Sequence, residues 1–168
     1  AATQGMKCGD QTDPATDIGQ MVSKASADRV MAMCADTCAQ GGTYALEPRQ
    51  DNALVTPGIV RYAPMTSRLW QEEVFGPIAI VNAFETVDDA LRLANDSPFG
   101  LQGSVLTRDL GAAFRFVDQF DVGALWINEA SRFRLDLYPF GGVKQSGVGR
   151  EGVRYAIEEM SQIKFVGI

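Results

Sequence analysis

The chain has 168 residues, of which 46% are apolar and 21% are charged, and its formal net charge is −6. This length and composition are typical of one globular domain with a hydrophobic core. The negative charge argues against a nucleic acid or an anionic membrane as partner, since both require clustered Lys and Arg, and the absence of a run of about 18 apolar residues argues against a membrane span.

Helices and strands alternate in the first half of the sequence. Residues 8–21 are rich in turn formers, and a helix is predicted over 23–40, ended by Gly41-Gly42. Its expected inner face comprises Ala27, Val30, Met31, Cys34 and Cys38. The elements expected next are a strand at 52–62 interrupted by Pro57, a short helix at 67–74, and a strand at 78–81 that is covered on both faces.

The alternation continues in the second half. Thr86 is expected to begin a helix that ends at 96–98, with Asp89 as its capping-box partner. The remaining elements are a strand at 103–106, a helix at 109–121, a strand at 123–127, a loop at 128–149, a helix at 150–161 and a strand at 162–168. This order predicts one α/β domain with a mostly parallel, buried sheet.

The sequence contains no histidine. A Ser-His-Asp or Cys-His nucleophile pair therefore cannot form within the chain, and a catalytic zinc site is not expected. The three cysteines follow no regular framework and the N-terminus has no signal-peptide pattern, so we expect a reducing compartment, the cytoplasm. Core or inert roles are expected for Cys8, Cys34 and Cys38.

The stretch Glu72-Glu73-Val74-Phe75-Gly76-Pro77 places two carboxylates, an aromatic ring and a rigid turn between a predicted helix and a predicted strand. A carboxylate accepts two hydrogen bonds from a sugar diol, and a flat ring packs against a heterocycle. The alternative is a charged helix end with a buried Phe and a turn, and the local pattern taken alone favours this alternative.

Two further stretches are candidate binding sites. Residues 147–152 match G-x-G-x-x-G, but a loop precedes them and no acidic residue can follow at the required distance, so we reject a dinucleotide site there. Residues 128–140 concentrate aromatic and charged side chains after a strand, which is typical either of a ligand site or of a surface loop with ion pairs.

Four stretches resemble the aldehyde dehydrogenase superfamily in the family's order and spacing, namely residues 9–19, 72–77, 94–101 and 139–151. The resemblance covers nearly the whole chain and implies the C-terminal part of the catalytic domain, a three-layer α/β/α fold. It implies a domain over residues 1–161 and a terminal oligomerisation strand over 162–168, which would make the protein a homo-oligomer. Gln11 and Gln20 stand where the family often has proline, which affects local turn geometry.

The resemblance also implies a chemistry. Family members use NAD or NADP to oxidise an aldehyde to a carboxylic acid, through attack by a cysteine thiolate and hydride transfer to the nicotinamide. The nucleophile and the general base are expected outside this chain, so the isolated chain is expected to be inactive. Glu73 would accept hydrogen bonds from the nicotinamide ribose, Phe75 would pack beside it, and Phe140 would line the aldehyde pocket.

Other site residues are implied by the same resemblance. Glu151 matches a carboxylate used by some relatives in a proton relay, and the carbonyl groups of Lys144 and Gly147 match a monovalent-cation site. The loop 129–137 matches the substrate-entrance segment. Its substrate-contacting candidates are Glu129, Ser131, Phe133 and Arg134.

Arg132 and Arg134 suggest an acidic aldehyde that carries a carboxylate, phosphonate or sulfonate. The alternative is that Arg134 pairs with Asp136 or Glu129 and contacts no substrate. A different function is also considered, a non-catalytic interaction module that binds a partner through its terminal strand. A CoA-dependent or acyl-phosphate reductase of the same superfamily is a weaker alternative.

Overall fold

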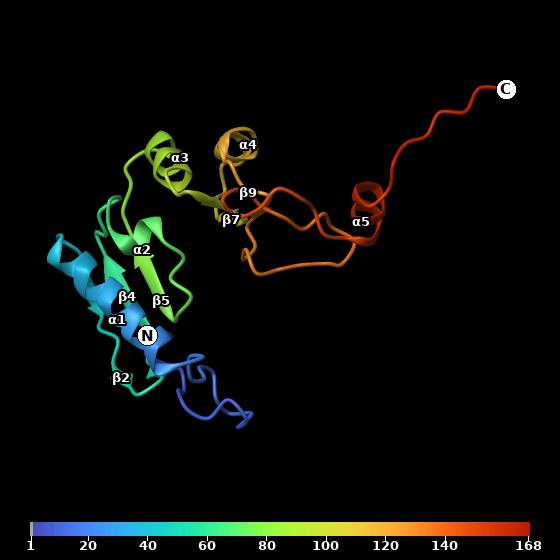
Figure 1. Cartoon of the computed structure of the whole chain (residues 1–168). Helices are drawn as coiled ribbons and strands as arrows, with labels where there is room; N and C mark the ends of the chain where they lie inside the picture. Colours follow the sequence, from blue (N-terminus) through green and yellow to red (C-terminus); the bar gives the residue numbers. More distant parts are fainter. Residues whose placement is uncertain (1) are drawn as a thin grey trace. The chain divides into compact units, whose positions relative to one another are not determined.

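The computed structural model describes residues 2–168, which form two compact units, residues 2–83 and 84–168. Each unit combines helices with short strands, as the sequence predicts (Figure 1). Within residues 2–168, no helix has the length and apolar character that crossing a membrane requires. The predicted assignment of residues 1–161 to a domain and of residues 162–168 to an oligomerisation strand stays a prediction.

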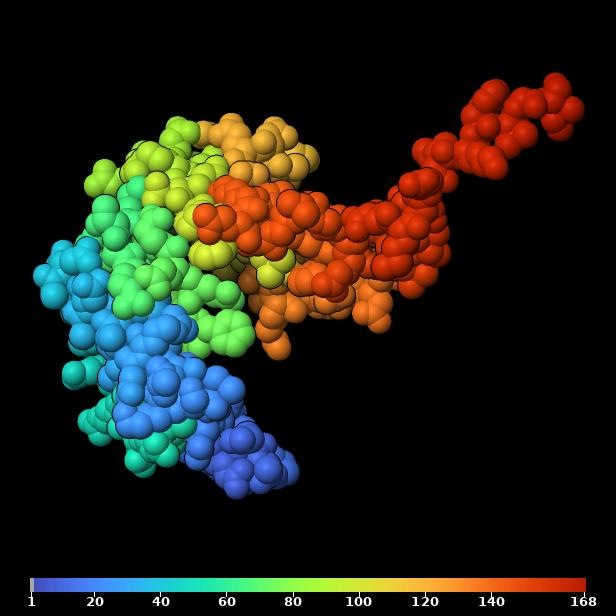
Figure 2. Space-filling model, in the orientation of Figure 1, coloured from blue at the N-terminus to red at the C-terminus, as the bar shows by residue number. Residues whose placement is uncertain are grey.

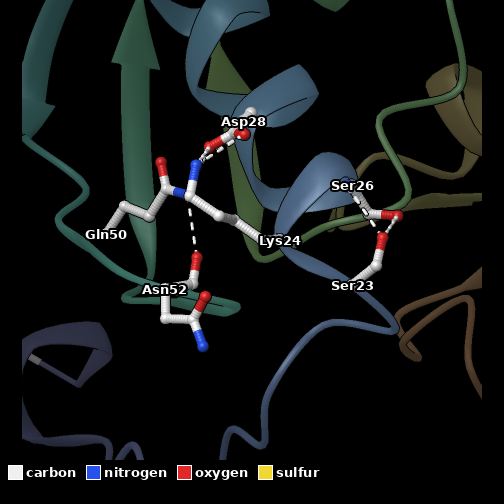
Figure 3. Close-up of polar contacts among 6 residues, drawn as sticks. All are labelled: Ser23, Lys24, Ser26, Asp28, Gln50 and Asn52. Carbon is white, nitrogen blue, oxygen red and sulfur yellow. Dashed lines mark hydrogen bonds and ion pairs between the residues drawn. The ribbon is translucent and has the colours of Figure 1, made fainter.

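Helix α1 spans Lys24–Ala39, close to the predicted range. It begins at Ser23, whose Oγ accepts a hydrogen bond from the Ser26 amide at 3.1 Å (Figure 3). Its fully buried residues recur at helical spacing and include two that the predicted inner face lacked, Met33 and Thr37. They are Ala27, Val30, Met33, Cys34 and Thr37.

The first unit contains a three-stranded sheet and a separate hairpin. The sheet has the order β1-β4-β5, with β1 antiparallel and β5 parallel to β4. The bounds are β1 Thr43–Leu46, β2 Gln50–Asp51, β3 Leu54–Val55, β4 Gly58–Arg61 and β5 Ile78–Val81. The strand predicted over 52–62 is interrupted at Pro57, as expected, and the two parts, β3 and β4, belong to different sheets.

A polar bridge joins the hairpin to α1. The Gln50 side-chain amide donates to Asp28 Oδ1 at 2.7 Å and to the Asn52 carbonyl at 2.8 Å (Figure 3). The chain then forms the single helical turn α2, Arg68–Gln71, shorter than the predicted helix at 67–74. Residues 72–77 are therefore a loop between α2 and β5.

The core of the first unit lies between α1, α2 and one face of the sheet. Met33 and Cys34 pack with Val60 of β4 and Leu69 of α2, and Ile78 and Ile80 of β5 join them. The other face of β5 is exposed, with Val81 at 52% exposure. The prediction that this strand is covered on both faces is thus wrong for this chain, because α1 covers one face only.

The second unit contains two parallel strands, a short antiparallel pair and three helices in its described residues. Strands β7 and β8 pair in parallel, and β6 pairs with β9. The predicted helix start at Thr86 is confirmed, since Thr86 Oγ1 accepts a hydrogen bond from the Asp89 amide and donates one to the Asp89 carboxylate. The bounds are α3 Val87–Asn95, β6 Phe99–Gly100, β7 Gln102–Val105, α4 Leu110–Gln119, β8 Ala124–Ile127, β9 Val143–Lys144 and α5 Val153–Glu159.

The structure differs from the prediction near the C-terminus. Helix α5 begins three residues later than predicted, because Gly152 before it has a φ of 127°, outside the helical region. Residues 162–168 form no strand and extend beyond α5 (Figures 1 and 2). A strand needs a neighbour to complete its backbone hydrogen bonds, and no segment within residues 2–168 pairs with this one.

Candidate functional site

The backbone of the loop 72–77 is held by α1. Arg29 Nη2 donates a hydrogen bond to the Val74 carbonyl oxygen at 2.6 Å, and Arg29 Nη1 donates to the Glu73 carbonyl oxygen at 3.3 Å. Gly76 also lies close to the helix. A Cβ atom at this position would stand only 2.9 Å from Val30 Cγ2. Helix α1 therefore fixes the course of the loop and the direction in which its side chains leave it.

The two neighbouring carboxylates of this loop have different environments. Glu72 accepts two hydrogen bonds from the Arg68 guanidinium, at 2.7 and 3.0 Å, and this contact lowers the pKa of Glu72. Glu73 is exposed, and its carboxylate has no hydrogen-bond or ion-pair partner within residues 2–168. Glu73 is thus the carboxylate that is free to accept hydrogen bonds from a ligand.

Phe75 is exposed and has an unusual backbone conformation. Its φ is 47° and its exposed fraction is 75%. A non-glycine residue at positive φ costs about 1 kcal/mol or more, and such strain gathers at functional sites. The alternative of a buried Phe at a plain turn is therefore wrong, since neither core burial nor a relaxed turn accounts for this residue.

In the second unit, Arg134, Phe140 and Glu151 come together. The guanidinium carbon of Arg134 lies 4.1 Å from the centroid of the Phe140 ring, and its Nη2 lies 3.1 Å from Glu151 Oε2. The Phe140 amide donates to the Glu151 carbonyl at 3.1 Å, and the reverse bond is 2.6 Å. The ion pair predicted as an alternative, with Asp136 or Glu129, is wrong, because this backbone bridge brings Glu151 to Arg134.

Phe140 and Glu151 also line a cavity of about 310 Å³. Polar and apolar groups share its wall, and Arg150 and Glu159 contribute opposite charges to it. Leu101 and Val148 add two further apolar side chains to the wall. A small molecule with one apolar and one polar end can be accommodated by such a wall.

The remaining candidates of the entrance segment are placed differently. Phe133 packs edge-on against Trp126 of β8, with ring centroids 5.1 Å apart, and Tyr138 lies 6.0 Å from the same ring. Glu129 and Ser131 are exposed, and the Glu129 carboxylate accepts a hydrogen bond from the next backbone amide at 2.7 Å. The structure therefore groups Arg134 with Phe140 and Glu151, and Phe133 with the strand beneath the loop.

Lys144 has a side-chain contact that the sequence reasoning missed. Its Nζ donates to the carbonyl oxygens of Asn95 and Ser97, at 2.9 and 3.2 Å, where α3 ends. Gly147 has a φ of 136°, which favours glycine. The predicted monovalent-cation site concerns the carbonyl groups of Lys144 and Gly147, and it stays a prediction.

Arg29 and Arg150 were also missed as positioning residues. Arg150 Nη1 donates to the carbonyl oxygens of Gly142 and Gly149, at 2.8 and 2.9 Å, and closes the glycine-rich loop around itself. The Arg29 contacts join residues 44 and 45 positions apart. Neither hydrophobic periodicity nor turn chemistry signals such contacts, because both describe only neighbours in the sequence.

The environment of Cys34 fits the predicted core role. Cys34 is completely buried, and burial raises the pKa of its thiol to about 11, with a smaller effect from Cys38. A thiol of this kind is a poor nucleophile near neutral pH, because the thiolate is the reactive form.

A sequence model of the aldehyde dehydrogenase family matches residues 1–166. The chain is 39% identical over 168 residues to an aldehyde-dehydrogenase-like protein of Sinorhizobium fredii, and the match covers all of the chain and 33% of that protein. It is 36% identical over 156 residues to the sulfoacetaldehyde dehydrogenase of Neptuniibacter caesariensis, covering 93% of the chain and 34% of that enzyme. The chain thus spans about a third of the length of these relatives.

The fold is similar to solved structures of the same family. The glyceraldehyde-3-phosphate dehydrogenase of Methanocaldococcus jannaschii, solved in complex with NADP, superposes with a TM-score of 0.90 at 34% identity. The match covers 97% of this chain and 35% of that one. The predicted α/β fold of the catalytic-domain type is therefore confirmed.

Proposed function

The chain belongs to the aldehyde dehydrogenase family, and from this premise we propose that it supplies the C-terminal part of the catalytic domain of an NAD(P)-dependent enzyme that oxidises an aldehyde to a carboxylic acid. The observation that carries the proposal is the loop 72–77, where a free carboxylate and an exposed, strained aromatic ring stand on a backbone fixed by Arg29. The nucleophile and the general base would come from residues outside this chain.

The loop fits a nicotinamide nucleotide by the chemistry of its side chains. The Glu73 carboxylate offers two acceptor oxygens to a ribose diol, and the exposed Phe75 ring offers an apolar face to the sugar and its base. When bound, the nucleotide would supply the hydride acceptor. The contribution of Glu73 is orientation, which accelerates a reaction by holding the reacting groups in the productive geometry. Arg29 supports it by fixing the backbone that carries Glu73.

The aldehyde side of the site involves Phe140 and Arg134. Phe140 would form an apolar wall, and the Arg134 guanidinium would bind an anionic group of the substrate with charge-assisted hydrogen bonds. The names of two relatives support an acidic aldehyde, since one acts on sulfoacetaldehyde and another on glyceraldehyde 3-phosphate. The alternative is that the substrate is an uncharged aldehyde. A comparison of the KM values for an acidic and a neutral aldehyde tests this alternative.

Further parts of the proposal concern the compartment and the assembly. We place the enzyme in the cytoplasm, because the three cysteines are free thiols. We propose that residues 162–168 pair with a neighbouring subunit, because Ile163 and Phe165 in this segment are fully or almost fully exposed. The proton-relay role of Glu151 and the cation site stay predictions.

The test is a chimera in which residues 1–166 replace the matching third of the sulfoacetaldehyde dehydrogenase of N. caesariensis. We expect it to oxidise sulfoacetaldehyde, and we expect Glu73→Gln to lower kcat by about 10- to 100-fold, because misplaced reacting groups cost rates of this size. Glu72→Gln is the matched control, since Glu72 is held by Arg68, and its kcat should stay within about twofold.

Circular dichroism and size-exclusion chromatography would establish that each variant is folded. A folded chimera without aldehyde oxidation would contradict the proposal and favour the interaction module. Equal effects of the two substitutions would show that Glu73 has no special part in orienting the cofactor. KM values for sulfoacetaldehyde and for acetaldehyde in Arg134→Ala would separate the acidic from the neutral substrate class, because only the acidic substrate should lose affinity.

A further inference from the structure

We propose that Glu151 is a positioning residue for Arg134, which it holds over the Phe140 ring as a preformed receptor for a sulfonate, phosphonate or carboxylate group. The inference rests on the proposed function in one respect, that the anion belongs to the aldehyde substrate. The anion site itself is a property of these three residues.

The three side chains are anchored through the backbone. Phe140 and Glu151 are joined by two reciprocal backbone hydrogen bonds, so the backbones that carry the ring and the carboxylate are held side by side. Arg134 lies in the loop that precedes Phe140, and its guanidinium contacts both partners, at 4.1 Å from the ring centroid and 3.1 Å from Glu151 Oε2. The ring restricts the plane of the guanidinium, and the carboxylate restricts its rotation within that plane.

The contact with Glu151 leaves most of the guanidinium available. An arginine carries five N–H donors, and within residues 2–168 the only hydrogen bond of the Arg134 side chain runs from Nη2 to Glu151. The Arg134 side chain is 42% exposed, so an anion in solution can reach it. A planar guanidinium with a free edge matches two oxygens of a sulfonate, phosphonate or carboxylate.

Glu151 has two opposing effects on such an anion. Its negative charge repels the anion, but Glu151 is 68% exposed, and water and salt screen repulsion between exposed charges. Its hydrogen bond reduces the rotamer freedom of a long side chain, and this freedom would otherwise be lost on binding. The hydrogen bond and the charge can be separated experimentally, because glutamine keeps an acceptor oxygen and removes the charge.

The test is a titration of the 168-residue chain with methanesulfonate, followed by ¹⁵N–¹H NMR of the Arg134 Nε–H group and the Phe140 amide. Dimethyl sulfone, which has a similar shape and no charge, is the control probe. We expect methanesulfonate to shift both signals and dimethyl sulfone to shift neither. We expect Glu151→Ala to weaken binding about 5- to 10-fold, and Glu151→Gln to bind within about twofold of the unchanged chain or more tightly.

A matched control comes from α5. Glu158 is an exposed carboxylate in an ion pair with Arg154 at 2.9 Å, and neither residue contacts Phe140. Glu158→Ala should leave methanesulfonate binding unchanged. Arg134→Ala should abolish the shifts, and the spectrum of each variant shows directly whether the chain is folded.

Two outcomes would overturn the inference. If Glu151→Ala bound methanesulfonate as tightly as Glu151→Gln, Glu151 would merely compete for Arg134. If Arg134→Ala bound as tightly as the unchanged chain, these residues would form no anion site. The titration requires no turnover, so an inactive chimera would contradict the proposed function and leave this result unaffected. Conversely, an active chimera could accompany a failed titration.

Discussion

Replacing Arg29 by Met should weaken the first unit by about 3 kcal/mol, because the substitution removes both hydrogen bonds that hold the loop 72–77. A hydrogen bond from a charged donor contributes about 1.5 to 3 kcal/mol, and a weaker one about 1 kcal/mol. The 2.6 Å bond to the half-buried Val74 carbonyl belongs to the first class, and the 3.3 Å bond to exposed Glu73 to the second. Methionine keeps the apolar stem of the side chain, so little packing is lost.

Urea unfolding followed by tryptophan fluorescence measures this loss. The chain has two tryptophans, Trp70 in the first unit and Trp126 in the second, so a Trp126→Phe background reports the first unit alone. For a slope of about 2 kcal/mol per M, the midpoint should fall by about 1.5 M. Arg29→Lys should give an intermediate value, since an ammonium group is smaller and cannot span both carbonyls.

Lys24→Met on the same helix is the matched control. The ion pair between Lys24 and Asp28 is exposed, with 63% and 50% of the side chains accessible, so its loss should cost less than about 1 kcal/mol. If Arg29→Met shifted the midpoint no more than Lys24→Met, the carbonyl contacts of Arg29 would not be what holds this loop.

The remaining predictions concern pH and packing. Burial raises the pKa of Cys34 from 9.0 to about 11. The unfolded thiol therefore loses its proton first, so the contribution of Cys34 to the free energy of unfolding should be constant below pH 9 and fall between pH 9 and 11. Cys34→Ala should flatten this fall in urea titrations, and an unchanged slope would refute the assignment. Gly123→Ala should lower stability by about 3 kcal/mol in thermal unfolding, because its Cβ would collide with the Gly141 carbonyl. Gly5→Ala, with open space around it, should change stability by less than about 0.5 kcal/mol, and equal losses would argue against the collision.

The elements that depend on neighbouring residues could be predicted from the sequence. The helix caps at Ser23 and Thr86 follow from side chains that accept hydrogen bonds from amides three residues away. The resemblance also singled out Glu73 and Phe75 as cofactor contacts. Their exposure is consistent with that role, which stays a proposal.

The strands were predicted less well than the helices. The stretch 52–62 divides at Pro57 into parts of two different sheets, and β1 was not predicted at all. Strand pairing joins distant segments, so the local alternation of side chains does not reveal which partner a strand takes. The wrong prediction for the outer face of β5 has a similar cause. An apolar run shows only that a strand can be covered, and it does not show which segment covers it.

The sequence by itself determined the family, the α/β class and the residue types at the loop 72–77, since these depend on motifs and on local periodicity. Only the tertiary structure decided that Glu73 is the free carboxylate, that Arg29 fixes its backbone, and that Arg134 pairs with Glu151. The physical reason is the length scale of the interactions. Caps and turns act over a few residues, whereas these hydrogen bonds join residues from 17 to 45 positions apart, and only folding brings such residues into contact.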